Sequence, residues 1–350
     1  MLSSLPKLAD RNFIIGFFVP ALLAALVVLW LFRDSDGVQQ VYEAVWKEKK
    51  WEEITVFALG VWVFSVVLML VNHFVYRMVE GYTAPMAWLG NSRLSKRRET
   101  LSQERQKLIS EVDGTTVEQV KDRLNKRIDA IDLILANDFP PLNFPVLPTR
   151  FGNAIRAFEA YALVVYGVDS IPAWGRLAAL APKQLASMTA DARAEVDFFL
   201  NTFILSMVLA LIALGQFLCS LSDIYAVWLA HYSRPQWALL SCTALCAVTS
   251  WLAYNGAVWR AVAWGECVKT TFDLGLPKLA NSLGYKLPKA GKERREFWTA
   301  FSLMALYQVP MEPSSFPAAS KAPATGSSGG NGDGGAGKDS DGEQDDGDAD

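Results

Sequence analysis

A glycine-rich stretch near the end of the chain has the spacing of a phosphate-binding loop. Residues 332–338 read G-x-x-x-x-G-K, the pattern in which backbone amides and a lysine hold the phosphates of a nucleotide. Asp339 stands where such a loop has a metal-binding Ser or Thr, and the surrounding carboxylates would repel phosphate. No strand pattern precedes the stretch and no helical pattern follows it. We interpret it as a chance match and predict no cofactor.

Histidines and cysteines are the other residue types that could catalyse a reaction or bind a metal. His73 and His231 are predicted at opposite ends of the membrane spans, so they cannot share a metal ion or activate one nucleophile. Cys242 and Cys246 are one helical turn apart, which suits either two metal ligands or small packing residues in a membrane helix, and no His or carboxylate accompanies them. We therefore predict no metal site, no catalytic residue and a protein that is not an enzyme.

A few other residues are candidates for binding or signalling. His73 precedes Arg77 by one turn near the end of the second span and could sense pH, unless it only contacts a neighbouring helix or the interface. Five charged or aromatic residues, one at the end of the second span and four in the insert, could couple a bound partner to the membrane, or could simply stabilise the core of a helical module and its docking to the membrane. They are Arg77, Arg150, Asp169, Trp174 and Arg176.

Four apolar blocks must position these residues. The chain of 350 residues is 51% hydrophobic with a mean hydropathy of +0.18, and the apolar residues are concentrated in these blocks. Each has about 20 residues, which at about 1.5 Å per residue matches the hydrocarbon thickness of a bilayer. We predict an all-α integral membrane protein with an uncleaved first span, kinked at Pro20. The predicted spans are 12–32, 54–76, 198–221 and 237–259.

The polar residues inside the predicted spans limit the possible functions. Apart from His73, the spans contain no side chain of the kinds that ion-coupled transporters place in the bilayer, since Asp, Glu, Lys and Arg are absent from them. This disfavours an ion-coupled transporter. Asn201, Gln216 and Asn255 are polar groups that could join neighbouring helices. An oligomeric pore or channel stays open as an alternative, because a pore lining needs no charge. Ion conductance in planar bilayers would test it.

Charges at the ends of the spans predict the topology. Lys and Arg gather on the side of the long insert and both termini, so these are predicted to be cytoplasmic, with two short hairpin connections outside. The predicted parts are a membrane hairpin, a cytoplasmic helical module, a second membrane hairpin, a cytoplasmic helical segment and a tail. Their ranges are 1–77, 78–197, 198–259, 260–310 and 311–350.

The insert is predicted to be helical. Leu94, Leu101 and Leu108 recur at heptad spacing, and apolar residues recur every three or four positions from Val117 to Leu135. They indicate two antiparallel helices, which either pair with each other or form a coiled coil between subunits. Thr115 and Glu118 have the spacing of a capping box for the second of them. After a proline-rich stretch, Thr149 is a predicted N-cap and Gly167 a predicted helix end, before a short helix with Trp174.

The last part of the chain changes character at about residue 310. A helix is predicted over 293–307, followed by a disordered tail rich in Pro, Ser, Gly and Asp. From residue 333 onward the tail has eight carboxylates and one lysine. The formal net charge of −3 therefore hides a mildly basic remainder, which suits cytoplasmic flanks and implies no nucleic-acid partner.

Three stretches together resemble a group of uncharacterised bacterial membrane proteins: VNHFVYRMVEGY, then LPTRFGNAIRAFEAY with YGVDSIPAWGRL, then TFDLGLPKLANSLGYKLP with KERREFW. The resemblance implies a four-span protein of the bacterial inner membrane and supplies no activity or site residues. We expect a non-enzymatic, homo-oligomeric protein whose cytoplasmic module couples a protein partner or signal to the membrane part. A membrane enzyme is the other alternative, and a cytoplasmic pocket that gathers several perturbed ionisable residues would favour it.

Overall fold

The computed structural model describes residues 10–33, 35–43, 51–221 and 235–311, and this part of the chain is all-helical, without a strand. Four of its helices are long and apolar enough to span a membrane, as predicted. The first is built from α1 (Arg11–Phe13), a π-helical turn (Ile14–Phe18) and α2 (Val19–Leu31). The others are α4 (Trp51–Glu80), α9 (Lys183–Ser220) and α11 (Gln236–Ser282).

The first span is irregular next to the predicted kink at Pro20. Because proline has no backbone N–H, Pro20 cannot donate the usual helical hydrogen bond to the carbonyl of Gly16, and a π-helical turn precedes it. The Asn201 amide of α9 donates to that carbonyl oxygen over 2.8 Å. A buried polar group in α9 thereby satisfies the backbone of the first span, as the sequence indicated for Asn201.

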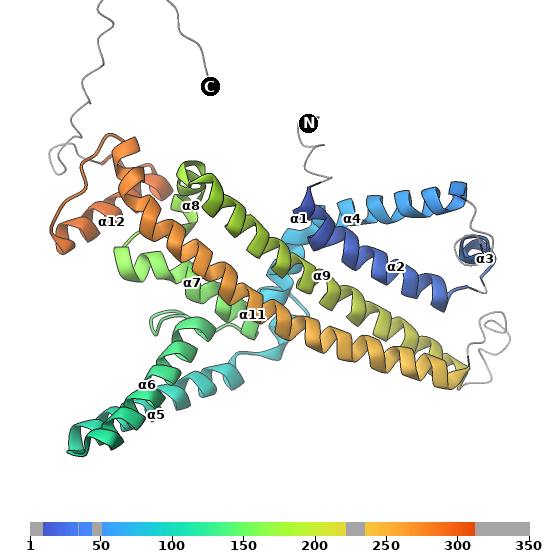
Figure 1. Cartoon of the computed structure of the whole chain (residues 1–350), viewed down its shortest axis with the longest axis horizontal. Coiled ribbons are helices and arrows are strands. Elements are labelled where there is room, and N and C mark those ends of the chain that lie inside the picture. Colours follow the sequence, from blue (N-terminus) through green and yellow to red (C-terminus); the bar gives the residue numbers. More distant parts are fainter. Residues whose placement is uncertain (1–9, 34, 44–50, 222–234, 312–350) are drawn as a thin grey trace, which may run out of the picture.

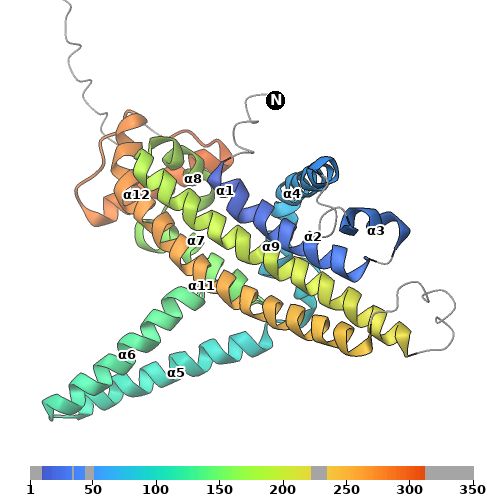
Figure 2. The ribbon, with the colours of Figure 1, turned by 45° about the vertical axis from the view of Figure 1, so that its right-hand side comes forward.

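Helices α9 and α11 pack side by side along most of their lengths (Figures 1 and 2). Small buried residues of α11, including Ala253 and Ala257, allow the close approach, and the Ser250 hydroxyl donates to the Phe203 carbonyl of α9 over 3.2 Å. Both helices are longer than their predicted spans: α9 begins at Lys183 and α11 continues to Ser282. Charges such as Arg260 mark where apolar sequence stops, and the helix continues past them.

Helix α4 lies against the first span and buries little of its own surface. Gly60 has open space around it, and Leu70 and Phe74 are more than two-thirds exposed. The connection that precedes α4 contains the short helix α3 (Asp36–Glu43). An apolar surface of this kind suits contact with lipid or with another membrane helix.

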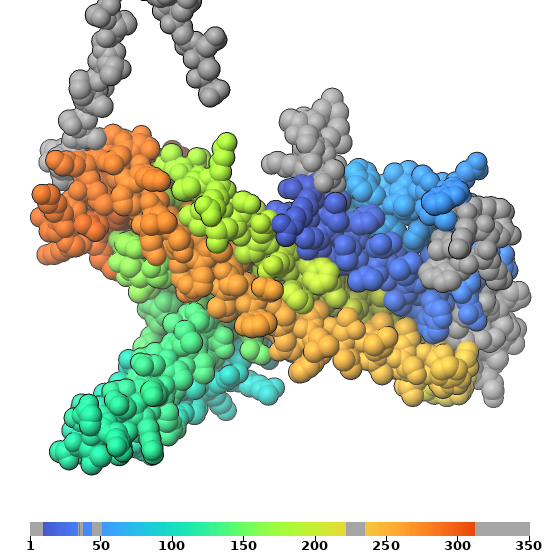
Figure 3. All heavy atoms as spheres, in the orientation of Figure 1, coloured from blue at the N-terminus to red at the C-terminus, as the bar shows by residue number. Residues whose placement is uncertain are grey.

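Helices α5 (Ser92–Gly114) and α6 (Glu118–Asp138) form an antiparallel arm that projects from the rest of the molecule (Figures 1 and 3). Leu108 and Ile131 are buried between them, so the two apolar stripes pair within the chain. The predicted capping box is wrong. Val117 is the N-cap residue without a side-chain hydrogen bond, and the Thr115 hydroxyl instead donates to the backbone of α5.

The opposite end from α3 is formed by α7 (Arg150–Tyr166), α8 (Ser170–Leu180), α12 (Gly291–Tyr307) and the outer ends of α9 and α11, which together we call the end module. Thr149 caps α7, and Gly167 ends it in the left-handed conformation, as predicted. A single core runs from membrane helices into the end module. Its largest buried side chains include Phe151, Phe272, Phe297, Trp298 and Phe301.

Candidate functional site

A large cavity lies where the first span and α4 meet the end module. It has a volume of about 840 Å³, and α7, α8, α9 and α11 complete its walls. Three of the predicted site residues line it: His73 and Arg77 from α4 and Trp174 from α8. His73 and Arg77 are exposed at its mouth, whereas Trp174 is half-buried against Phe272. The structure thus brings together residues that are about 100 positions apart in the sequence.

Asp197 of α9 is the central polar group of this cavity. Its side chain is only 6% exposed, and its Oδ1 accepts hydrogen bonds from the Asn72 amide over 3.0 Å and from the Tyr76 hydroxyl over 2.8 Å. The Arg193 guanidinium, one turn earlier on α9, interacts electrostatically with it. A buried carboxylate needs hydrogen bonds or a counter-charge, and α4 and α9 supply both.

The surrounding backbone brings three helices close to Asp197. Asn72 and Tyr76 are four residues apart and therefore share one face of α4. On the other side, a Cβ atom on Gly16 would lie 3.1 Å from the Cβ of Asp197. A glycine therefore permits the first span to approach α9 at this level. The carboxylate, its two donors and the Gly16–Asn201 contact form one polar layer across three candidate membrane helices.

Asp197 was not among the predicted site residues. It is the last residue of the predicted insert, directly before the predicted third span. One signal pointed to it: Asp197 and Asn201 are four residues apart, on the same helical face as the apolar Ala194. Without knowing that α9 begins well before the apolar block, this face could not be recognised as buried.

A second group of charges lies near the mouth of the cavity. Glu80 of α4 and Glu159 of α7 both line it, and their carboxylates repel each other. Burial raises the pKa of Glu159, and the nearby guanidinium groups of Arg156 and Arg77 partly oppose this shift. The Arg156 Nη1 lies 3.8 Å from a Glu159 carboxylate oxygen. The cavity therefore combines a buried acid with a partly solvated, charged entrance.

The other predicted site residues do not line this cavity. Asp169 is the N-cap of α8, where its carboxylate accepts from the Ile171 amide over 3.0 Å. Arg176 donates to the Pro172 carbonyl over 2.6 Å and lies 5.8 Å from the centre of the Phe301 ring. Both contacts stabilise the end module. Arg150 lines a separate hollow at the start of α7.

The LPTRFGN stretch joins α7 to the end of α4. Thr149 donates to the Glu80 carbonyl over 3.0 Å while it accepts from the Gly152 amide, also over 3.0 Å. The Asn153 side chain is fully buried and bonds to the backbone of Leu147 and Thr149. These contacts account for the Thr, Gly and Asn of the motif structurally, and they fix the wall of the cavity that Glu80 and Glu159 share.

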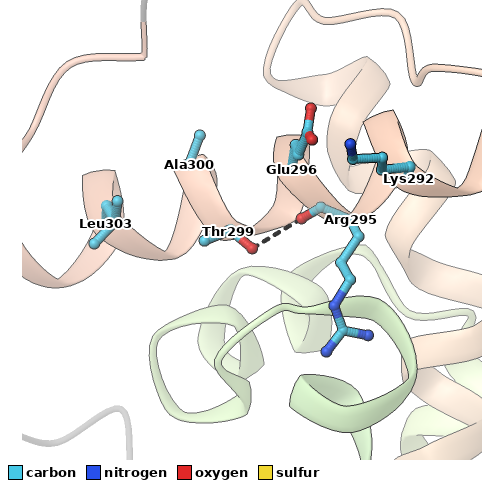
Figure 4. Close-up of a pocket in the computed structure, with 6 residues that line it drawn as sticks. All are labelled: Lys292, Arg295, Glu296, Thr299, Ala300 and Leu303. Atoms are coloured by element: carbon cyan, nitrogen blue, oxygen red, sulfur yellow. Dashed lines mark hydrogen bonds between the residues drawn. The ribbon is translucent and has the colours of Figure 1, made fainter.

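A shallower hollow of about 450 Å³ lies on α12 (Figure 4). Its Arg295 points from α12 toward the end of α7 and donates to the carbonyls of Val164 over 2.8 Å and Leu163 over 3.3 Å. Both carbonyls belong to the last turn of α7, where the Gly167 amide also donates to that of Leu163 over 3.1 Å. The guanidinium adds a donor to each carbonyl and complements the helix dipole. We assign this hollow a structural role.

The described residues offer no cluster of three or more His, Cys, Asp or Glu side chains placed to hold a metal ion. Cys246 is buried, and Cys242 packs against the same apolar cluster, beside α9. No protein-family model, curated protein or solved structure matches this chain. The function must therefore be inferred from the geometry.

Proposed function

We propose that this chain is a non-enzymatic protein of the bacterial inner membrane in which a cytoplasmic helical module is coupled to a four-helix membrane part through the cavity around Asp197. The observation that carries the proposal is the position of this carboxylate. It is held by α4, it belongs to a helix that enters both parts, and the cavity around it is also lined by α8 of the end module.

The continuous helices support mechanical coupling. No break separates the apolar halves of α9 and α11 from their outer halves in the end module. At the level of the cavity, Glu195 of α9 and Arg260 of α11 form an ion pair of 3.0 Å. A change in the polar layer that moves α4 against α9 would therefore be transmitted along a stiff pair of helices to the end module, or in the reverse direction.

The charges of the cavity suggest the class of signal. Its lining contains four carboxylates, from Asp10, Glu80, Glu159 and Asp197, against the guanidinium groups of Arg77 and Arg193. A small ligand with an amine or another cationic group complements this excess of negative charge. Under this proposal the partner of the membrane part is a cationic ligand or a protein segment that presents one.

Hydrogen exchange of the purified full chain tests the coupling. In Asp197→Asn the amide can no longer accept from Asn72 and Tyr76 with the strength of a carboxylate, so we expect faster amide exchange in α8, which touches Asp197 only through the cavity. Asp191→Asn is the matched control, because Asp191 lies on the same helix outside the cavity. Unchanged exchange over residues 170–180 in Asp197→Asn would contradict the proposal.

The oligomeric part of the proposal rests on α4, whose exposed apolar face suits a second copy as well as lipid. The assembly mass of the protein in detergent tests it. A homo-oligomer is expected, and a monomer that copurifies with no partner would exclude it.

The same cavity favours one alternative, a membrane enzyme. It gathers Asp197, Glu80, Glu159 and His73, which are groups capable of acid–base catalysis, and the pKa of Glu159 is raised by burial. Incubation of the reconstituted protein with a bacterial lipid and metabolite extract, followed by mass spectrometry, would reveal a turned-over substrate. Under this alternative, Glu159→Gln abolishes the turnover; no turnover by the wild type favours the coupling proposal.

A further inference from the structure

A second hollow, separate from the cavity around Asp197, lies where the base of the α5–α6 arm meets α9 and α11. Its volume is about 770 Å³. One wall is cationic and the other is apolar. We call it the arginine slot, defined by three arginines and an apolar floor: Arg93, Arg97 and Arg150, and Phe203, Leu211 and Trp251.

The three arginines have no opposing charge in the slot. Arg93 and Arg97 are four residues apart on one face of α5, and Arg150 is the first residue of α7. None of the described residues that line the slot has a carboxylate, and none of the three arginines forms an ion pair with a described residue. Three guanidinium groups that converge without a counter-charge are complementary to an anion, and guanidinium groups suit phosphate oxygens in particular.

One N–H donor of the Arg150 side chain has no hydrogen-bond partner among the described residues. Its Nη1 donates to Asn255 over 3.2 Å, whereas its Nε is buried without a hydrogen-bond partner. The Tyr254 hydroxyl accepts from the backbone amides of Arg150 and Phe151 over 3.2 and 3.5 Å. The start of α7 is therefore held by Tyr254, while the buried N–H of the arginine side chain remains available to an anionic oxygen. Leaving such a group unpaired is costly.

The apolar floor belongs to helices that can span a membrane. Phe203 and Leu211 lie on α9 and Trp251 lies on α11; Leu211 is 61% and Trp251 65% exposed. The floor extends from Phe203 to Leu211 of α9, which is eight residue steps or about 12 Å along the helix axis. A ligand that fills the slot thus needs an anionic head at the arginines and an apolar body that runs along the membrane helices.

We propose that the arginine slot binds an anionic phospholipid, with its phosphate at Arg93, Arg97 and Arg150 and an acyl chain along the apolar floor. A free phosphate compound would leave this floor uncovered. An acidic peptide would have to place unpaired backbone groups against membrane helices, where water cannot satisfy them. The site is independent of the proposed coupling cavity, because no residue lines both.

Native mass spectrometry of the full chain in detergent tests the slot. The probes are phosphatidylglycerol and phosphatidylcholine with identical chains, and the wild type is expected to retain the anionic lipid in preference. Arg93→Gln/Arg97→Gln should weaken phosphatidylglycerol binding roughly 30-fold, since each lost charge near a membrane surface costs about a factor of five. The control Arg123→Gln/Lys126→Gln removes two charges from exposed positions of α6 and should bind like the wild type.

A third variant separates a lipid from a simple anion. Ala247 lines the slot and is exposed, so Ala247→Phe narrows the apolar floor without changing any charge. It should weaken phosphatidylglycerol binding and leave any binding of inorganic phosphate unchanged. Equal retention of both lipids, full binding by the arginine double variant, or inorganic phosphate that displaces phosphatidylglycerol at equal concentration would each overturn the proposal.

Discussion

Single residues at helix contacts decide how closely the parts of this molecule approach each other. Gly16 lets the first span reach Asp197, and Gly152 lets the start of α7 reach the end of α4. Polar side chains at these contacts donate to backbone carbonyls. The Asn201 amide donates to the carbonyl of Gly16, to which Pro20 cannot donate, and the Thr149 hydroxyl donates to the carbonyl of Glu80. The absence of a Cβ atom makes room for a close approach of two helices. The absence of a backbone N–H leaves a carbonyl that a polar side chain must satisfy.

Gly152 is the most constrained of these positions. A Cβ atom there would lie 2.1 Å from the carbonyl oxygen of Glu80, which is backbone and cannot rotate away. We expect Gly152→Ala to destabilise the protein by about 3 kcal/mol and to lower its Tm by several degrees. Gly175→Ala on α8 is the control, because it has open space around it and should be neutral or stabilising by up to about 1 kcal/mol. Equal Tm values for both variants would contradict the close contact.

Glu159 should make stability depend on pH. Burial raises its pKa in the folded protein above the ordinary value of 4.5, so the folded state binds the proton more tightly than the unfolded state. The stability contributed by this group is therefore complete below about pH 4.5 and is lost as the pH rises through the folded pKa. Glu80, Arg77, Arg156 and Asp169 also influence the site. Glu159→Gln removes the titration of Glu159 together with the repulsion that its carboxylate exerts on Glu80, and both losses favour the folded variant as the pH rises.

Thermal unfolding of wild type and Glu159→Gln between about pH 4 and about pH 8 measures this contribution. The variant should gain Tm relative to the wild type as the pH rises, with little difference at the acidic end. The exposed Glu99→Gln serves as the control and should follow the wild type at every pH. A constant difference between Glu159→Gln and the wild type over the whole range would refute the raised pKa.

At the scale of elements, local sequence signals predicted most helices. The arm, α7 and α12 follow from apolar periodicity, and Thr149 and Gly167 mark the two ends of α7 because their chemistry acts within one turn. The capping box at Thr115 failed because the helix begins two positions later than predicted: Val117 is its N-cap, so Glu118 is the first helical residue and not the third. The continuation of α11 through Pro277 was not predictable, because tertiary packing of Phe272 and Leu276 outweighs the helix-breaking residue.

The α5–α6 arm should unfold independently of the membrane helices, because it projects from the body and has its own small core (Figure 2). Leu108 is only 4% exposed there, and Leu108→Ala should cost about 2–5 kcal/mol within the arm. Hydrogen exchange should then accelerate over residues 92–138 and stay unchanged in α9 and α11. Leu133→Ala, at a residue that is 63% exposed, is the control and should leave exchange as it is. Faster exchange throughout the chain would show that the arm is not a separate unit.

At the scale of the whole molecule, the four apolar helices were predictable and the two hollows between them were not. Hydropathy identifies a span from the residues of that span alone, whereas the cavity forms only where α4, α8 and α9 pack against one another. Three of its residues were selected from the sequence: His73 and Arg77 as polar residues near the end of the second span, and Trp174 as an aromatic residue of the insert. The decisive Asp197 was missed because its burial depends on where α9 begins, which is a property of packing and not of local composition.

The orientation of the chain in the membrane is the last prediction at the scale of the whole molecule. Lys and Arg near the inner ends of the spans predict that the arm and both termini face the cytoplasm and that α3 faces outward. Gln40 of α3 and Gln103 of α5 are both exposed, so Gln40→Cys and Gln103→Cys should each accept a thiol reagent that has access to its side of the membrane. In intact bacterial spheroplasts, a membrane-impermeant maleimide should label Gln40→Cys above the level of the native cysteines and Gln103→Cys only after permeabilisation. The reverse pattern would invert the proposed topology, and labelling of both before permeabilisation would place α3 and the arm on the same side.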